Sequence, residues 1–276
     1  MTAELTAPAV ELNGFVDPWR SDALRTLLDL APPDPAAGLP LLWHLVHLLE
    51  HPAPADIGAD GHPSAGIPAP PEPGRRRMWA GGRVTTLGPL YAGREAARRT
   101  TLRASVEKIG RTGPLTFVTV AHEIVQDGRT VAEEEQDILY RPADSRFDPA
   151  SGAPNPAAGL AAARARLDPD PVLLFRFSAL TYNGHRIHYD RDYARDVEGY
   201  PGLLVHGPLQ ALMMAETGRR ASGHDGPARF SYRLVAPLFD GTGFEAVAVA
   251  AEDGYATTVR DDTGRVTARG RFTPTG

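Results

Sequence analysis

Hydrophobic residues recur at three- and four-residue intervals in two early segments, 19–30 and 39–50, and in a later one from Pro208 to about Ser222. This spacing puts apolar side chains on one face of an α-helix, so it predicts a helix in each segment. The later segment starts with a proline, which suits the first helical turn. It is apolar on nearly all sides, which predicts a buried helix wrapped by a sheet.

Between and after these helices lie short segments that are rich in β-branched residues and separated by turns with glycine. Those of the first half, at 100–109, 115–125 and 130–140, predict an antiparallel meander. Those of the second half lie at 172–180, 228–238, 244–253, 255–261 and 266–273. The pattern predicts an α+β protein of two successive halves, each with one helix and one curled sheet.

Proline clusters divide the chain. The cluster at 51–74 predicts a long loop, and the cluster at 142–171 predicts a linker. Within the second cluster, the Ala- and Arg-rich stretch 160–167 predicts one or two helical turns. We therefore expect an N-terminal half with a helical extension at residues 1–145, a linker at 146–170 and a C-terminal half at 171–276.

Composition narrows the class of function. The 29 basic and 34 acidic residues give a net charge of −5, which offers no footprint for nucleic acid or an anionic membrane. The longest apolar run, 39–49, is too short to span a bilayer, and the amino terminus lacks signal-peptide features. The absence of cysteine excludes disulfides and thiolate chemistry. A cytoplasmic enzyme or binding protein for a small molecule is expected.

The densest polar cluster is Tyr182-Asn183-Gly184-His185-Arg186-Ile187-His188-Tyr189-Asp190, and His206-Gly207-Pro208 follows it. The cluster resembles the active-site segment of the MaoC-like, R-specific enoyl-CoA hydratase and dehydratase family. In that family, Asp-x-Asn-Pro-x-His precedes a His-Gly pair that opens the central helix of a hot-dog fold. Segments 76–83, 133–141, 175–190 and 199–211 most resemble the branch with mesaconyl-CoA (C-4 thioester) hydratase, itaconyl-CoA hydratase and fungal hydroxyacyl-thioester dehydratases.

The resemblance implies a double hot-dog fold, with two antiparallel sheets each wrapped around a central helix. The first half lacks the histidine cluster and is expected to be catalytically degenerate. The implied activity is that of a hydro-lyase that reversibly hydrates a 2-enoyl thioester, such as the short dicarboxylic mesaconyl- or itaconyl-CoA. The expected partner is a small-molecule acyl thioester. No metal or redox cofactor is expected. Coenzyme A is the implied carrier and part of the substrate, while acyl carrier protein as the carrier and a homodimer are left open.

The resemblance also assigns candidate catalytic residues. His188 matches the catalytic histidine, and a neutral imidazole suits the activation of water near pH 7. The backbone N–H of Gly207, at the start of a helix, is a candidate donor to the thioester oxygen. Asn183 stands where the family has its catalytic Asp, and an amide cannot accept the proton. Either His188 works alone while Asn183 holds the water, which we favour, or His185 or Asp190 supplies a second titrating group.

Candidate substrate-binding residues are Tyr182, His206 and Arg186, the last for a free carboxylate on the acyl group. The arginine-rich stretches 75–77 and 94–103 either meet the phosphates of coenzyme A or form solubilising surface.

Several other polar residues are predicted to be structural. His44, His47 and His51 share one face of the expected helix 39–50 without a carboxylate at metal-binding spacing, which predicts a solvated stripe. Most side chains of His122-Glu123 and of 133–135 are expected to face solvent, because side chains alternate along a strand.

Two other functions fit the same fold. One is a hot-dog thioesterase, which commonly uses a carboxylate to activate water against the carbonyl; Asn183 argues against it. The other is a non-catalytic acyl-thioester-binding module, which the missing acid would explain.

Overall fold

The computed structural model describes residues 9–69, 71–110, 113–143 and 160–275. The strands of the first part are β1 (Val10–Phe15), β2 (Arg75–Thr86), β3 (Glu95–Gly110), β4 (Gly113–Gln126) and β5 (Arg129–Pro142). The others are β6 (Ala161–Leu167), β7 (Ala228–Leu234), β8 (Phe244–Ala251), β9 (Gly254–Asp261) and β10 (Val266–Pro274). They pair into one sheet in the order β1-β3-β4-β5-β2-β7-β10-β9-β8-β6.

The two halves of this sheet meet where β2 pairs with β7, and all neighbouring strands are antiparallel. At the junction, residues 81–85 of β2 lie opposite residues 229–233 of β7. The expectation of two separate sheets is therefore wrong. In two separate sheets, β2 and β7 would each be an edge strand with unpaired backbone N–H and C=O groups. Pairing β2 with β7 gives these groups hydrogen-bond partners.

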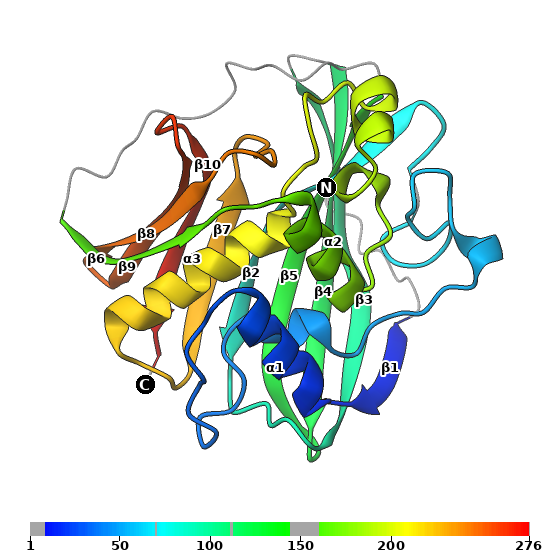
Figure 1. The fold of residues 1–276 in the computed structure, drawn as a ribbon. Coiled ribbons are helices and arrows are strands. Elements are labelled where there is room, and N and C mark those ends of the chain that lie inside the picture. The colour runs from blue at the N-terminus through cyan, green and yellow to red at the C-terminus, as the bar shows by residue number, and fades with distance from the viewer. Residues whose placement is uncertain (1–8, 70, 111–112, 144–159, 276) are drawn as a thin grey trace.

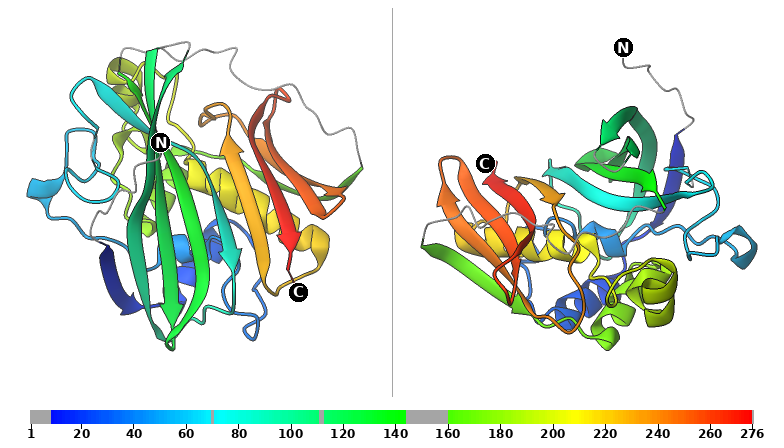
Figure 2. Two further views of the ribbon diagram at one scale, coloured as in Figure 1. Left: turned by 180° about the vertical axis from the view of Figure 1, so that it is seen from behind. Right: turned by 90° about the horizontal axis from the view of Figure 1, so that it is seen from above.

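The long helix α3 (Gly207–Ser222) confirms the helix predicted at this place. It packs against β6, β8, β9 and β10, and Figures 1 and 2 show these strands curling around it. Its residues from Leu209 to Gly218 are all buried, as the apolar pattern indicates. Pro208 stands in the first turn, and Gly223 ends the helix in the left-handed conformation that glycine adopts without strain.

The first half of the sheet has no equivalent of α3 among the described residues. The helix α1 (Pro18–Leu27) was predicted, and it packs against α2 (Pro171–Leu180). The helix expected at 39–50 is reduced to the 3₁₀ turn η1 (Trp43–Val46), because Leu42 and Leu48 adopt positive φ angles that no helix tolerates. The prediction of a central helix in each half is therefore only half met.

Two segments have the opposite secondary structure from the one predicted. Residues 172–180 form α2 rather than a strand, because Pro171 begins the helix and the Asp170 carboxylate accepts a hydrogen bond from the backbone N–H of Leu173. Residues 160–167 were expected to be helical. They form β6, whose side chains alternate in exposure while the strand pairs with β8.

The expected solvated stripe is also wrong, because the segment that carries η1 covers the first half of the sheet. His44 and His47 are both buried, and Nε2 of His44 lies 2.9 Å from an oxygen of the buried Glu134 on β5. His122 on β4 is buried as well, with Nδ1 2.9 Å from the hydroxyl of Thr100. Of the acidic groups expected to face solvent, Glu134 is the one on the covered face.

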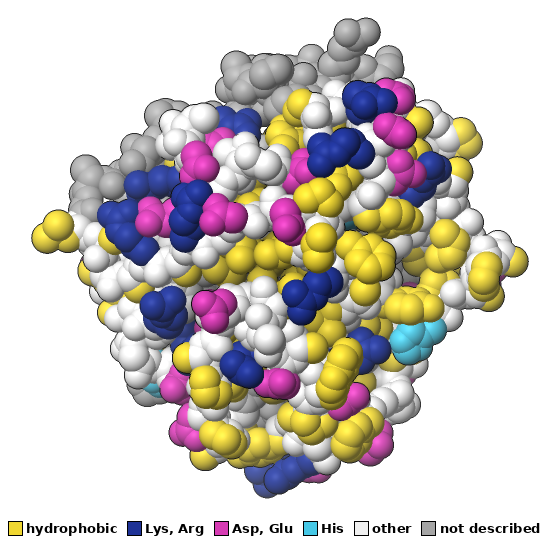
Figure 3. Space-filling model, viewed as in Figure 1, with side chains coloured by type: hydrophobic (Ala, Val, Ile, Leu, Met, Phe, Trp, Pro, Cys, Tyr) yellow, Lys and Arg dark blue, Asp and Glu magenta, His cyan; other side chains and the backbone are white. Residues whose placement is uncertain are grey.

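The surface gives no sign of a nucleic-acid interface on the face shown in Figure 3, where acidic and basic side chains are interspersed. Among the helices of the described residues, none is long and apolar enough to cross a bilayer.

Candidate active site

The polar cluster of the sequence forms a tight loop that leaves α2 and enters the 3₁₀ turn η3 (Arg186–His188). The side-chain oxygen of Asn183 accepts a hydrogen bond from the backbone N–H of His185 at 3.0 Å, and its own backbone N–H bonds to the carbonyl of Ser178. Asn183 thus braces the loop with its carbonyl oxygen, which leaves its NH₂ group to meet a ligand.

His188 is buried and held in one tautomer. Its Nδ1 lies 2.8 Å from the backbone carbonyl oxygen of Leu204. Because a carbonyl only accepts, Nδ1 carries the hydrogen and Nε2 keeps the lone pair. Burial lowers the pKa of His188 to about 4. The residue is therefore a neutral imidazole at physiological pH, with Nε2 as the basic atom.

His206 connects this imidazole to the amino end of α3. Its ring stacks on that of His188 with 3.7 Å between centroids, and its Nε2 lies 2.8 Å from the hydroxyl of Ser178 on α2. His206 is completely buried, which holds its pKa well below the ordinary value. Because His206 immediately precedes Gly207, the stack brings His188 and the start of α3 together, as the sequence predicted.

Gly207 has a packing role in addition to the expected one. A Cβ at this position would lie 2.3 Å from Cδ1 of Leu234 and 3.6 Å from Cβ of Trp79. The missing side chain therefore lets α3 approach β2 and β7. The N–H groups of the first turn of α3 still lack partners within the helix, so they remain available as donors.

The structure adds two residues that the sequence analysis missed, Asp60 and His62. They lie in the proline-rich loop, which packs against the loop of His185, and the rings of His62 and His185 are 4.0 Å apart. Nδ1 of His62 lies 2.9 Å from a carboxylate oxygen of Asp60. The one available signal was the Asp-Gly-His sequence at 60–62. It was not distinctive, because nothing along the chain says which loop will meet the histidine cluster.

Burial and the contacts among Asp60, His62 and His185 shift the pKa values of these three side chains. Burial lowers the pKa of His62 and of His185, and the positive charge of Arg77 acts in the same direction on both. Burial alone would raise the pKa of Asp60, but hydrogen bonds from His62 hold it below its usual range. Arg77, on β2, is thus close enough to act on the histidines.

Asp60, His62 and His185 carry atom types that can bind a metal ion. Oxygen and nitrogen atoms of Asp60, His62 and His185 lie within 4.8 Å of one another. His62, however, already bonds to Asp60, and its ring lies over that of His185 with an interplanar angle of 40°. Histidine binds metals through lone pairs in the plane of the ring, so overlapping rings do not direct both lone pairs to one point.

Two of the expected substrate-binding residues, Tyr182 and Arg186, lie in different surroundings. Tyr182 is exposed, with its ring 5.0 Å from that of His51. Arg186 is already engaged, because Nε and Nη2 bond to one oxygen of Asp190 at 3.0 and 2.8 Å. Its guanidinium also lies 4.2 Å from the centre of the Tyr193 ring. Asp190 therefore already pairs with the guanidinium group of Arg186, which was expected to bind a free carboxylate of the substrate. Asp190 itself has a structural role in the local turn.

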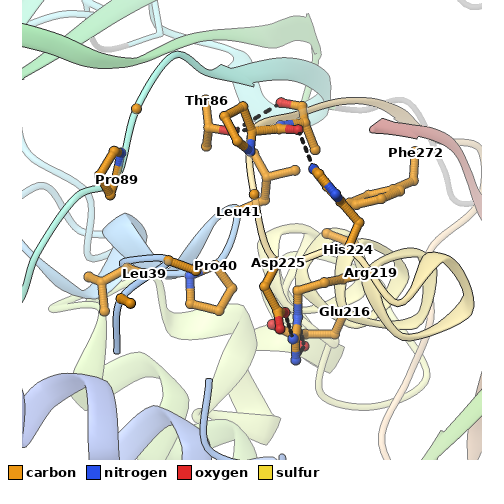
Figure 4. Close-up of a pocket in the computed structure, with 17 residues that line it drawn as sticks. Leu39, Pro40, Leu41, Thr86, Pro89, Glu216, Arg219, His224, Asp225 and Phe272 are labelled. Atoms are coloured by element: carbon orange, nitrogen blue, oxygen red, sulfur yellow. Dashed lines mark hydrogen bonds and ion pairs between the residues drawn. The ribbon is translucent and has the colours of Figure 1, made fainter. Parts of the chain in front are cut away.

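A cavity of about 190 Å³ lies elsewhere, near the carboxyl end of α3 (Figure 4). It is lined by Leu39, Pro40, Leu41, Glu216, Arg219, Phe272 and their neighbours. Arg219 forms ion pairs with Glu216 and Asp225, so its charge is compensated. Along the helix, this cavity lies about 12 to 18 Å from the histidine cluster at the amino end, given a rise of about 1.5 Å per residue.

The depressed pKa of His188 leads to a prediction about pH. An ordinary histidine is protonated below about pH 6.5, but His188 stays neutral until the pH falls toward about 4. If His188 is the base, kcat/KM for the reaction proposed below should be no lower at pH 5.5 than at pH 7.5. Steady-state rates across this range would check it, and a loss with an apparent pKa near 6.5 would contradict it.

Comparison with known proteins gives one family match, one curated relative and two solved structures. The profile of a family described as hydroxyacyl-thioester dehydratase type 2 matches residues 42–240. Mesaconyl-C(4)-CoA hydratase of Chloroflexus aurantiacus is 43% identical over 232 residues, or 83% of this chain and 82% of that enzyme. A solved MaoC-like dehydratase has a TM-score of 0.72 at 15% identity and covers 97% of this chain and 98% of its own.

A further solved structure, HtdX of Mycobacterium tuberculosis, has a TM-score of 0.67 at 15% identity, covering 96% of this chain and 98% of its own. At this level of identity, the two structural matches show a common fold.

Proposed function

This chain belongs to the hydroxyacyl-thioester dehydratase type 2 family, and we propose that it reversibly hydrates a 2-enoyl-CoA thioester to the 3-hydroxyacyl-CoA. The family match, the 43% identical hydratase and the MaoC-like dehydratase structure confirm the resemblance of the chain to MaoC-like hydratases and dehydratases. The chain is accordingly a hydro-lyase with the hot-dog fold of that family. The observation that carries the proposed mechanism is the neutral His188 held beside the amino end of the buried helix α3.

Hydration of a conjugated thioester needs three groups. A base deprotonates the water that attacks the β-carbon, an acid protonates the α-carbon, and donors stabilise the negative charge that builds up on the thioester oxygen. We assign the first task to Nε2 of His188 and the third to backbone N–H groups at the start of α3, including that of Gly207. The NH₂ group of Asn183 is left to orient the water. Coenzyme A enters as part of the substrate, and the reaction uses no metal or redox cofactor.

The substrate we propose is a short dicarboxylic acyl-CoA of the mesaconyl or itaconyl type. The 43% identity to mesaconyl-C(4)-CoA hydratase supports this choice. Since Arg186 is paired with Asp190, Arg77 is the better candidate to meet the free carboxylate, because its charge already acts on the histidine group and arginine forks suit carboxylates.

We further propose that the chain is a double hot dog with halves at 1–145 and 171–276. The junction of β2 with β7 supports this division, because it joins the five strands of the first half to β7, β8, β9 and β10 of the second. The strand β6 (Ala161–Leu167), which lies in the stretch proposed as the linker, extends the second part of the sheet. The second half would supply His188 and α3.

The proposal is tested by incubating the protein with a panel of enoyl-CoA and 3-hydroxyacyl-CoA esters that includes mesaconyl and itaconyl thioesters. We expect mass spectrometry to show the gain or loss of one water, with the greatest kcat/KM on a dicarboxylic ester. Release of free thiol without a hydrated product would instead indicate a thioesterase. Binding of the esters without any change of mass would indicate a binding module.

A further inference from the structure

We infer that His62, oriented by Asp60, is the second proton-transfer group of the proposed hydratase reaction, so that both halves of the chain build the active site. This inference rests on the proposed function. It answers the question that Asn183 raises, namely which group replaces the missing carboxylic acid. The candidate comes from the long loop before β2, outside the polar cluster of residues 182–190.

The loop that carries His62 is fixed against the histidine cluster by its backbone. Gly61 has a φ of +90°, and a Cβ there would lie 1.8 Å from the carbonyl oxygen of Gly184. Only glycine permits this contact. The backbone N–H of Arg186 bonds to the carbonyl of Asp60 at 2.9 Å. The two loops are therefore docked as one unit, and the position of His62 is set by the same residues that position His185.

Asp60 orients the imidazole of His62. One oxygen of Asp60 lies 2.9 Å from Nδ1 of His62, and the other accepts the backbone N–H of His62 at 3.0 Å. Because a carboxylate only accepts, Nδ1 carries a hydrogen and Nε2 is the atom that gains or loses a proton. The carboxylate also stabilises the imidazolium that forms during transfer, as in the Asp-His pairs of hydrolases.

His62 and His188 belong to one cluster of rings, in which His185 contacts both. The centroid distances from the ring of His185 are 4.0 Å to His62 and 5.6 Å to His188. The side chains of His62 and Asp60 are 18% and 30% exposed, whereas His206 at the other end of the cluster is fully buried. The side chain of His62 is therefore in contact with solvent, unlike that of His206. The ionisable groups that act on His62 and its neighbours are Asp60, Arg77, His185 and His188.

The reaction balances with one proton shared by the two histidines. In hydration, Nε2 of His188 takes a proton from water, and the oxygen of that water bonds to the β-carbon. The electrons of the carbon–carbon double bond move toward the thioester and give an enolate. The proton on His188 then passes through solvent to Nε2 of His62, which is neutral at the start because its pKa is lowered, and His62 gives that proton to the α-carbon. Dehydration is the reverse, with His62 as the base for the α-proton.

The test uses the full chain with His62→Gln and Asp60→Asn. For His62→Gln we expect kcat to fall by about 10²- to 10⁴-fold, the usual contribution of one proton-transfer group, with KM within about threefold. Asp60→Asn should lower kcat at least about tenfold, because an amide no longer fixes the tautomer or stabilises the imidazolium. The matched control is Asp56→Asn, the same change in the same loop at an exposed residue, which should leave kcat unchanged.

A chemical rescue distinguishes proton transfer from a merely structural role. His62→Gly leaves space for a ring, so added imidazole should raise kcat at least tenfold, while it should not affect Asp56→Asn. The inference is overturned if wild type hydrates the ester and His62→Gln keeps kcat within threefold, or if only KM changes. It is also overturned if EDTA abolishes activity and zinc restores it. If wild type hydrates no ester at all, the proposed function itself fails.

Discussion

Replacing His188 with asparagine is expected to lower kcat for hydration by about 10²- to 10⁴-fold, the loss typical of one positioned base. The amide NH₂ of asparagine can still donate to the carbonyl of Leu204, which Nδ1 contacts at 2.8 Å. It has no counterpart to the lone pair on Nε2. The variant should therefore fold as wild type does and bind substrate with a similar KM, while turnover is lost.

The matched control is His224→Asn at the far end of α3. His224 also places a ring nitrogen near a backbone carbonyl, at 3.0 Å from Pro227, but far from the histidine cluster. It should retain full activity. Product formation followed by mass, with thermal melting of both variants, would check the prediction. A His188→Asn protein that keeps more than a third of wild-type kcat would mean that another group activates the water.

Replacing His44 with alanine is expected to lower the free energy of unfolding by about 3–5 kcal/mol, the cost of leaving a buried charge without its partner. Glu134 is 3% exposed, and its carboxylate lies 2.9 Å from Nε2 of His44. Burial alone would raise the pKa of Glu134, but contact with His44 holds it below the ordinary value. Without His44, the carboxylate must remain as an unpaired charge or take up a proton.

Urea unfolding at pH 7 would measure this loss. The exposed His51 is the control, and His51→Ala should change the free energy of unfolding by less than about 0.5 kcal/mol. A double variant, His44→Leu with Glu134→Leu, should be less destabilised than His44→Ala, because it removes the charge together with its partner. Equal losses in His44→Ala and His51→Ala would show that the pair adds nothing to stability.

Local sequence patterns correctly predicted the buried helix and most of the strands that pack around it. The helix at 208–222 was evident from its apolar residues, and the strands β7, β8, β9 and β10 were evident from β-branched segments separated by turns with glycine. The pattern failed at 172–180, an apolar segment of nine residues that is consistent with either a strand or a short helix. There, the cap formed by Asp170 and Pro171 decided for the helix.

The sequence by itself determined the histidine segment, the start of the buried helix and their proximity, because His188 and His206 lie in one short stretch of chain. Only the tertiary structure decided which distant residues join them. Asp60 and His62 stand more than one hundred positions away, and His44 meets Glu134 across 90 positions. Such contacts depend on how loops pack onto the folded sheet. The close backbone contact of Gly61 with Gly184 is one example. Periodicity reports which face of an element is buried, but it carries no information about the partner on that face.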